Sequence, residues 1–319
     1  MRSRKLTYLG AGIVVVLIAG AVACTQSPSL SPAEGQKTFG SAEEASDSLI
    51  AVAGRGDTNG LLEIFGSDGK DLVSTADPVQ DKNKIAAFAA KATEKRVINF
   101  DPKDSSKATL LVGKDTWPFP VPLVKTSGKW WFNTEAGYDE ILLRRIGSNE
   151  LDAIQVCHGF VDAELEYATL ARGYTGVTQY AQKVISTPGK RDGLYWQNPD
   201  GSPGGPISDA VAKAIEEGYS ATHRTAYHGY YFKILKGQGP AAPLGELDYM
   251  VNGIMIGGFA LLAVPAEYQV TGIKSFMVSY DGVVYEKDLG PDSINIGKSI
   301  DRYNPDESWH KTDDQWPET

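Results

Sequence analysis

The residues best suited to chemistry in this sequence lie in one long loop and at the start of one predicted strand. The loop, residues 188–206, is rich in Gly, Pro, Asp and Asn and contains Arg191, Asp192, Tyr195 and Trp196. Loops of this length in a compact domain are usually either functional or mobile. A cation beside aromatic rings could bind a small molecule or a glycan, whereas Tyr195 and Trp196 could equally pin the loop to the core. We take these four residues as candidate ligand-binding residues.

His228 and Tyr230 stand at the start of a predicted strand, residues 228–235. A histidine with distant carboxylates, for which Asp192 and Glu267 are the candidates, could act as the general base of a hydrolase. The sequence nevertheless contains no G-x-S-x-G nucleophile elbow, no H-E-x-x-H zinc motif and no phosphate-binding P-loop. A structural histidine is the alternative interpretation. We therefore name no catalytic residue and keep His228 and Tyr230 as candidate binding residues.

The composition argues against two further kinds of site. The chain carries 31 Lys and Arg against 40 Asp and Glu, a net charge of −9, which does not favour a broad basic surface for nucleic acid. Two cysteines and four histidines offer few metal ligands. Cys157 and His158 are adjacent on a predicted helix, so their side chains diverge by about 100° and cannot form a nucleophile–base pair. We expect no nucleic-acid partner, no metal and no other cofactor.

The N-terminus has the pattern of an export signal. Arg2, Arg4 and Lys5 precede an uncharged, mostly apolar run over residues 8–23, and Cys24 follows three small residues. A basic start, a short apolar run and small residues before a cleavage point indicate a signal peptide over residues 1–23. A cysteine at this position resembles the lipobox of bacterial lipoproteins, which implies lipidation of Cys24. An uncleaved membrane anchor is the alternative, although the run is short for a spanning helix.

Lipidation of Cys24 would attach an exported protein to a membrane through its lipid. Thr25, rather than Asp, at the next position favours the periplasmic face of the outer membrane in a cell with two membranes. Residues 24–38, rich in Ser, Pro and Gln, then form a flexible linker. Cys157 would be the remaining cysteine, so no intramolecular disulfide is expected.

Residues 39–147 predict a first α+β domain. The S-x-x-E pattern at Ser41 and Glu44 predicts a helix start, and Asp81 is the expected cap of a later helix that extends to Lys95. Strands are predicted over residues 96–100, 108–112 and 121–132, the last folded into a hairpin at residues 126–128.

Residues 148–310 predict a second α+β domain, in which a helix packs on an antiparallel sheet, and residues 311–319 predict a polar tail. The longest helical pattern, residues 135–171, contains the sequence Gly-Ser-Asn-Glu at 147–150, which we expect to break it into two helices. Asp281-Gly282 between two alternating segments is a strong hairpin signal. The other predicted elements are a loop with a short helix (174–185), a helix (207–218) and strands (228–235, 259–264, 273–280, 283–287).

Several segments resemble known families. GKRDGLYW, YHGYYFKIL, GGFALLAVPAEY, TGIKSFMVSYDGVVYEKDLG and NPDESW together resemble the bacterial family called domain of unknown function 2950, from about Trp117 to Trp309. That resemblance implies a location and a fold but no reaction. The helix, the Gly229–Phe232 motif and the Thr271-Gly272 pair loosely resemble the globular part of type IV pilins and pseudopilins, although the pilin leader motif is absent.

The first domain loosely resembles the cone-shaped NTF2-like and cystatin-like domains over residues 39–134. Trp117, Trp130 and Phe132 could line a pocket in such a cone or simply form its core.

Three functions fit these observations. The favoured one is a non-catalytic cell-envelope lipoprotein that binds a protein partner or supports an assembly. The second is a small-molecule or glycan-binding protein that uses the aromatic loop. The third is an envelope hydrolase centred on His228 and Asp192.

Overall fold

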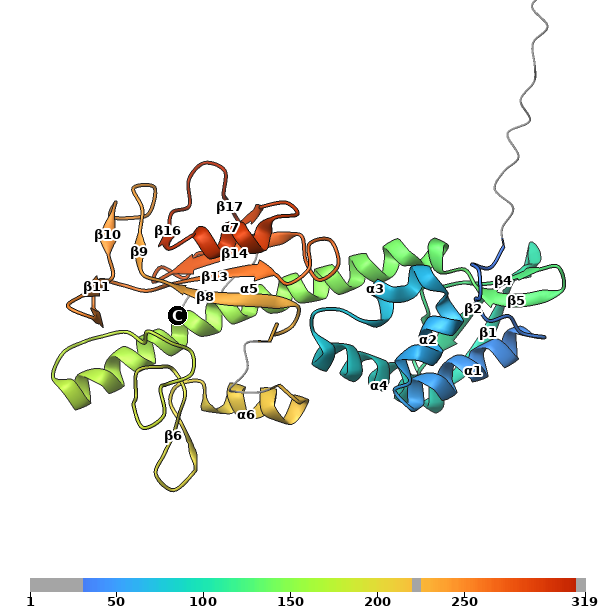
Figure 1. Cartoon of the computed structure of the whole chain (residues 1–319), viewed down its shortest axis with the longest axis horizontal. Coiled ribbons are helices and arrows are strands. Elements are labelled where there is room, and N and C mark those ends of the chain that lie inside the picture. Colours follow the sequence, from blue (N-terminus) through green and yellow to red (C-terminus); the bar gives the residue numbers. More distant parts are fainter. Residues whose placement is uncertain (1–30, 220–224, 314–319) are drawn as a thin grey trace, which may run out of the picture. The chain divides into compact units, whose positions relative to one another are not determined.

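The computed structural model describes residues 31–219 and 225–313 (Figure 1). The predicted signal peptide, Cys24, most of the predicted linker and residues 314–319 of the predicted tail lie outside the described residues. The described residues from Pro32 onward belong to one compact unit.

Short helices open the described chain. Ser41 accepts a hydrogen bond from the backbone N–H of Glu44 at 3.0 Å, which confirms Ser41 as the predicted N-cap. The carboxylate of Glu44 accepts its bond from the N–H of Gly40 rather than from that of Ser41, so the reciprocal half of the capping box is displaced by one residue. The later cap is Asp77 rather than Asp81, because the carboxylate of Asp81 instead accepts hydrogen bonds from Thr75. The elements are α1 (Ala42–Gly54), α2 (Thr58–Phe65), the 3-10 helix η1 (Ser67–Gly69), α3 (Lys70–Val73) and α4 (Pro78–Glu94).

An antiparallel sheet follows, in the order β1–β2–β4–β5 with β3 beside β2, and it confirms the predicted strands. The predicted hairpin turn lies between β4 and β5, where Ser127 and Gly128 have φ values of 51° and 80°. Phe132 and Trp130 are buried in the first hydrophobic core, whereas Trp117 is 41% exposed. The strands are β1 (Arg96–Asp101), β2 (Asp104–Val112), β3 (Trp117–Pro118), β4 (Leu123–Thr126) and β5 (Lys129–Phe132).

Helix α5 (Thr134–Thr175) runs unbroken for 42 residues, so the predicted break at residues 147–150 is wrong. Gly147 lies in open space and is tolerated there. Asn149 does not cap a second helix, because its buried amide donates to the carbonyl of Thr271 at 2.8 Å. The C-terminal end is later than predicted and has Gly176 in the left-handed conformation. No helix follows over residues 177–185, so the predicted short helix is also wrong.

The second large sheet is antiparallel in the order β17–β15–β14–β13–β8, and α5 packs on β13 and β14 (Figure 1). The predicted turn at Asp281-Gly282 joins β14 to β15, with Gly282 at a φ of 71°. The fold class is therefore α+β, as predicted. The strands are β8 (Tyr230–Leu235), β13 (Ala260–Pro265), β14 (Lys274–Ser279), β15 (Tyr285–Asp288) and β17 (His310–Lys311).

Two helices and three small sheets complete the described fold. Helix α6 is closed by Gly218, as predicted, and this C-cap residue has a φ of 105°. These elements are α6 (Ser208–Glu217), α7 (Ser293–Ser299), β6 (Trp196–Gln197), β7 (Pro203–Gly204), β9 (Gly237–Gln238), β10 (Leu247–Asp248), β11 (Met250–Val251), β12 (Ile254–Met255) and β16 (Arg302–Tyr303).

The described residues contain two hydrophobic cores, one around β1–β5 and one around β8, β13 and β14. Ile141 of α5 packs against the first core, whereas Ala153 and Phe160 belong to the second. The boundary between the two predicted domains, at residues 147 and 148, falls inside this shared helix, and the division into domains stays a prediction.

Candidate functional site

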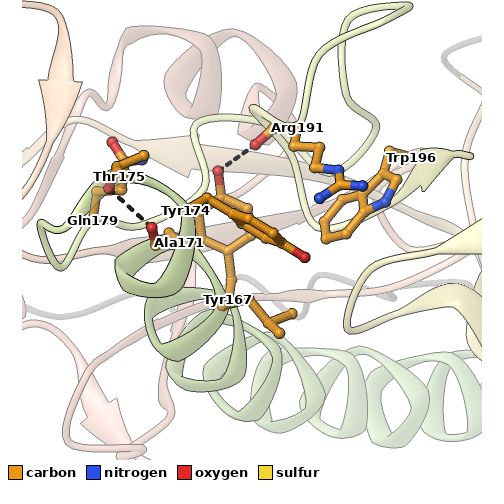
Figure 2. Close-up of a pocket in the computed structure, with 8 residues that line it drawn as sticks. Tyr167, Ala171, Tyr174, Thr175, Gln179, Arg191 and Trp196 are labelled. Atoms are coloured by element: carbon orange, nitrogen blue, oxygen red, sulfur yellow. Dashed lines mark hydrogen bonds between the residues drawn. The ribbon is translucent and has the colours of Figure 1, made fainter.

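An open pocket of about 250 Å³ lies between the last turns of α5 and the loop that follows it (Figure 2). The helix supplies one face of the pocket, because its five lining residues have the spacing i, i+3, i+4, i+7 and i+8. The loop supplies an amide, a cation and an indole ring. The lining residues are Tyr167, Leu170, Ala171, Tyr174, Thr175, Gln179, Arg191 and Trp196.

The guanidinium of Arg191 stacks on two aromatic rings of this pocket (Figure 2). Its central carbon lies 4.7 Å from the ring centre of Tyr174 and 5.3 Å from that of Trp196. Both distances are typical of cation–π interactions. Within the described part of the chain, no carboxylate forms an ion pair with Arg191.

Arg144 offers a useful comparison. Its guanidinium also stacks on an indole, with 4.6 Å between the guanidinium carbon and the ring centre of Trp117. Unlike Arg191, it forms an ion pair with a carboxylate, that of Glu140, at 2.6 Å. The same stacking therefore occurs once with a protein carboxylate and once without one.

The loop that carries Arg191 is fixed on both sides. The buried phenol of Tyr167 donates to the carbonyl oxygen of Arg191 at 2.5 Å. The carboxylate of Asp192 accepts hydrogen bonds from the backbone and hydroxyl of Thr187, both at 2.7 Å, and from Lys183 at 3.1 Å. Burial raises the pKa of Asp192, but these hydrogen bonds outweigh it and lower the pKa to about 2. Asp192 thus holds the loop and does not face the pocket.

Trp196 is held in place by close packing. It is buried, and its indole N–H donates to the side chain of Asn198 at 3.2 Å. The backbone of β7 approaches the indole so closely that a Cβ added at Gly204 would lie 2.6 Å from the indole nitrogen. The ring against which Arg191 stacks is therefore already fixed without a ligand.

The other candidate binding residues lie elsewhere. The backbone N–H of Tyr195 donates to Val184 at 2.9 Å and its carbonyl accepts from Ser186 at 2.8 Å, and its side chain does not line the pocket. Tyr230 is fully buried and donates to the carbonyl of Lys274 at 2.8 Å. Tyr230 is therefore a core residue of the second sheet.

His228 forms a separate cluster with two carboxylates. Its Nδ1 lies 2.6 Å from Asp152 of α5, and its Nε2 lies 3.6 Å from Glu217 of α6. The hydrogen bond to Asp152 raises the pKa of His228 despite its partial burial, and Glu217 adds to this rise. Because both ring nitrogens face carboxylates, the imidazolium form is favoured. A protonated histidine suits a structural ion pair between α5 and α6 better than it suits a general base, which must be neutral to accept a proton. The structure shows no contact between His228 and Asp192, the two residues on which the predicted hydrolase is centred.

A buried hydrogen-bond network adjoins this cluster. The phenol of Tyr219 donates to the carboxylate of Asp77, and the backbone N–H of Gly229 donates to the same carboxylate at 3.0 Å. The ring of Tyr227 contacts the rings of both Tyr219 and His228, with centroid distances of 4.9 Å and 4.3 Å. The network joins α4 to the start of β8.

Five pocket residues were missed from the sequence, all on α5. The spacing of Tyr167, Leu170, Ala171, Tyr174 and Thr175 was the available signal, but the predicted helix ended at residue 171 and placed Tyr174 in a loop. Gln179 was missed as well, because one glutamine in a loop carries no spacing signal.

A second, larger cavity of about 390 Å³ lies beside the β1–β2 hairpin, lined by residues that include Phe100, Lys107 and Pro122. Its lysine forms a 3.3 Å ion pair with Asp104. Because that cation is already paired, this cavity has weaker features of a ligand site than the first.

The described ranges offer neither a metal site nor a membrane-spanning helix. No group of three or more His, Cys, Asp or Glu in residues 31–219 and 225–313 is arranged to hold a metal ion. None of the helices in these ranges has the length and hydrophobicity needed to cross a bilayer.

Comparison with known families identifies the chain. The model of a family described as protein of unknown function (DUF2950) matches residues 36–312. The chain belongs to the DUF2950 family. The match covers both hydrophobic cores and the pocket, so each is part of the DUF2950 region. No curated protein matches this DUF2950 chain. No solved structure matches it either, so the looser resemblances to pilin heads and to NTF2-like domains are not confirmed.

Proposed function

We propose that this protein is an exported lipoprotein of the cell envelope that acts as a non-catalytic binding module and takes a small molecule in the pocket of Arg191 and Trp196. Export and lipidation are supported by the basic start, the apolar run and Cys24. Binding is supported by the pocket at the C-terminal end of α5.

One observation carries the binding proposal. Arg191 forms no ion pair with any carboxylate of residues 31–219 and 225–313, and it is stacked on Tyr174 and Trp196 beside a cavity. Natural sites combine an apolar, aromatic wall with a few fixed polar groups. Here the loop is fixed by Tyr167 and Asp192, so a ligand would meet a preformed site and lose little free energy in ordering it.

The test is a fluorescence titration of the full chain in detergent with a panel of monosaccharides, amino acids, organic acids and nucleosides. We expect at least one class to change the emission of Trp196, and Trp196→Phe to remove that change. Trp117→Phe is the matched control, because it removes the other indole that carries a stacked arginine. A panel with no binder, or a response that survives Trp196→Phe but not Trp117→Phe, would contradict the proposal.

A protein partner in the envelope is a second candidate. The segment around β10–β12 exposes apolar side chains that lie outside both hydrophobic cores. Exposed apolar patches often mark interaction surfaces. These residues are Leu244, Leu247, Val251, Ile254 and Ile256. In-cell crosslinking of the full chain, compared with a Leu244→Ser/Ile254→Ser variant, tests this: a specific envelope protein should be captured by the unsubstituted chain and lost from the variant.

A further inference from the structure

The chemistry of the pocket indicates which class of small molecule it takes. Arg191 is the charged residue among those that line it. A stacked guanidinium has its faces against the rings and directs its N–H groups outward in its own plane, where they fit the two oxygens of a carboxylate. Arg144, the matched stacked arginine, already has such a carboxylate from Glu140.

The last turn of α5 lines the pocket together with Arg191. The C-terminal end of a helix carries a partial negative charge, which stabilises a nearby cation. Two carbonyls of the last turns are already satisfied, that of Ala171 by the hydroxyl of Thr175 at 2.9 Å and that of Arg172 by the N–H of Gly176 at 2.9 Å. No described carboxylate forms an ion pair with the Arg191 guanidinium, and the carboxylate of the neighbouring Asp192 pairs with Lys183 instead.

The remaining walls limit the body of the ligand. Tyr167, Leu170 and Ala171 present a ring and aliphatic carbon, and Gln179 adds one side-chain amide. A cavity of about 250 Å³ suits one ring or a short chain rather than an oligomer. One cation matches one anionic group, whereas a phosphate dianion would call for further cations.

We propose that the ligand is a small monocarboxylate with a ring-shaped or short apolar body, whose carboxylate pairs with Arg191 while its body lies along Tyr167 and Leu170. This inference rests on the proposed function and names its ligand class. The same chemistry occurs in sugar acids and in aromatic or alicyclic acids, and the choice of probes separates these sources.

The experiment compares each acid with its neutral counterpart by calorimetry on the full chain in detergent. The pairs are benzoate with benzamide, cyclohexanecarboxylate with cyclohexanecarboxamide, and glucuronate with glucose. We expect the acid of at least one pair to bind ten-fold or more tightly than its counterpart, and binding to weaken as salt rises. The pair that shows the difference identifies the source.

Variants then assign the effect to Arg191. Arg191→Gln should weaken binding of that acid at least ten-fold, and Arg191→Lys should restore part of it. Arg144→Gln, the matched control, should leave binding unchanged. Circular dichroism and thermal unfolding establish that each variant is folded.

Three results would overturn the inference. If a compound of the wider panel binds through Trp196 while no acid is preferred, or if Arg191→Gln binds the acid as well as the unsubstituted chain, the ligand class is wrong and the proposed function stands. If no compound binds, both fall together.

Discussion

The phenol of Tyr219 donates to the fully buried carboxylate of Asp77, with oxygen–oxygen distances of 3.0 and 2.8 Å, across 142 residues of sequence. Burial, together with this hydrogen bond, raises the pKa of Tyr219, so the phenol stays protonated and remains a donor. The same carboxylate caps α4 through the N–H of Gln80 at 3.0 Å.

Removal of that phenol should destabilise the fold. Tyr219→Phe leaves a buried carboxylate with one partner fewer, which typically costs about 1–3 kcal/mol. Urea unfolding of the full chain measures this loss of unfolding free energy. Tyr227→Phe is the matched control, because its ring packs on that of Tyr219 but its hydroxyl has no hydrogen bond to Asp77. Equal, small effects of the two variants would show that the hydrogen bond contributes nothing.

The ion-paired His228 should make stability depend on pH. Its pKa is raised in the folded state, so its contribution is complete below the ordinary value of 6.5 and is lost as the pH rises through the folded pKa. His228→Gln and Asp152→Asn should both flatten this part of the profile. We would measure the free energy of unfolding between pH 5.5 and 9, and an unchanged slope in both variants would contradict the assignment.

Glu164 should make the stability of the fold depend on pH over a second, wider range. Burial raises its pKa from 4.5 to about 8, although the N–H of Ala181 donates to it at 2.8 Å. The neutral form is favoured in the fold, so stability is highest below pH 4.5 and falls until about pH 8, by roughly 1.4 kcal/mol per pH unit at most. Glu164→Gln should therefore stabilise the protein at pH 8 but not at pH 4.5. A variant less stable at both would show that the carboxylate has another role.

Two glycines of α5 should respond in opposite ways to alanine. A Cβ at Gly147 meets nothing within 4 Å, so Gly147→Ala should stabilise the helix by about 0.5–1 kcal/mol. A Cβ at Gly137 would lie 2.6 Å from the backbone of Val121, so Gly137→Ala should destabilise the protein. Thermal unfolding of both variants checks this, and a loss of stability in Gly147→Ala would mean that the helix does bend there.

The sequence predicted the strands well, because alternation and turn residues are local signals. The Asp281-Gly282 hairpin and the β4–β5 turn are examples. It failed inside α5, where Asn149 is a strong local cap signal but the carbonyl of Thr271, distant in sequence, takes its amide instead. The failed cap at Asp81 has a local origin, since Thr75, six residues earlier, donates to the carboxylate of Asp81 while Asp77 caps the helix.

The candidate site was predicted in part. Arg191 and Trp196 were recognisable as candidates from their residue types. Asp192, however, holds its loop through hydrogen bonds to Thr187, and the sequence did not indicate that Asp152 is the partner of His228. Residue type shows which side chains can do chemistry. Residue type does not show which helix will supply the carboxylate partner of His228, because that depends on how the chain packs.

Helix α5 rises about 1.5 Å per residue and so spans about 63 Å with its 42 residues. Ile141 and Phe160 lie on this one helix but pack in different cores. Unfolding of either core would therefore remove packing from part of the helix that the other core also needs. The two cores should therefore unfold as a cooperative pair. Amide protons in the middle of the helix would then exchange with solvent only when the whole protein opens, while those beside the pocket exchange through local opening.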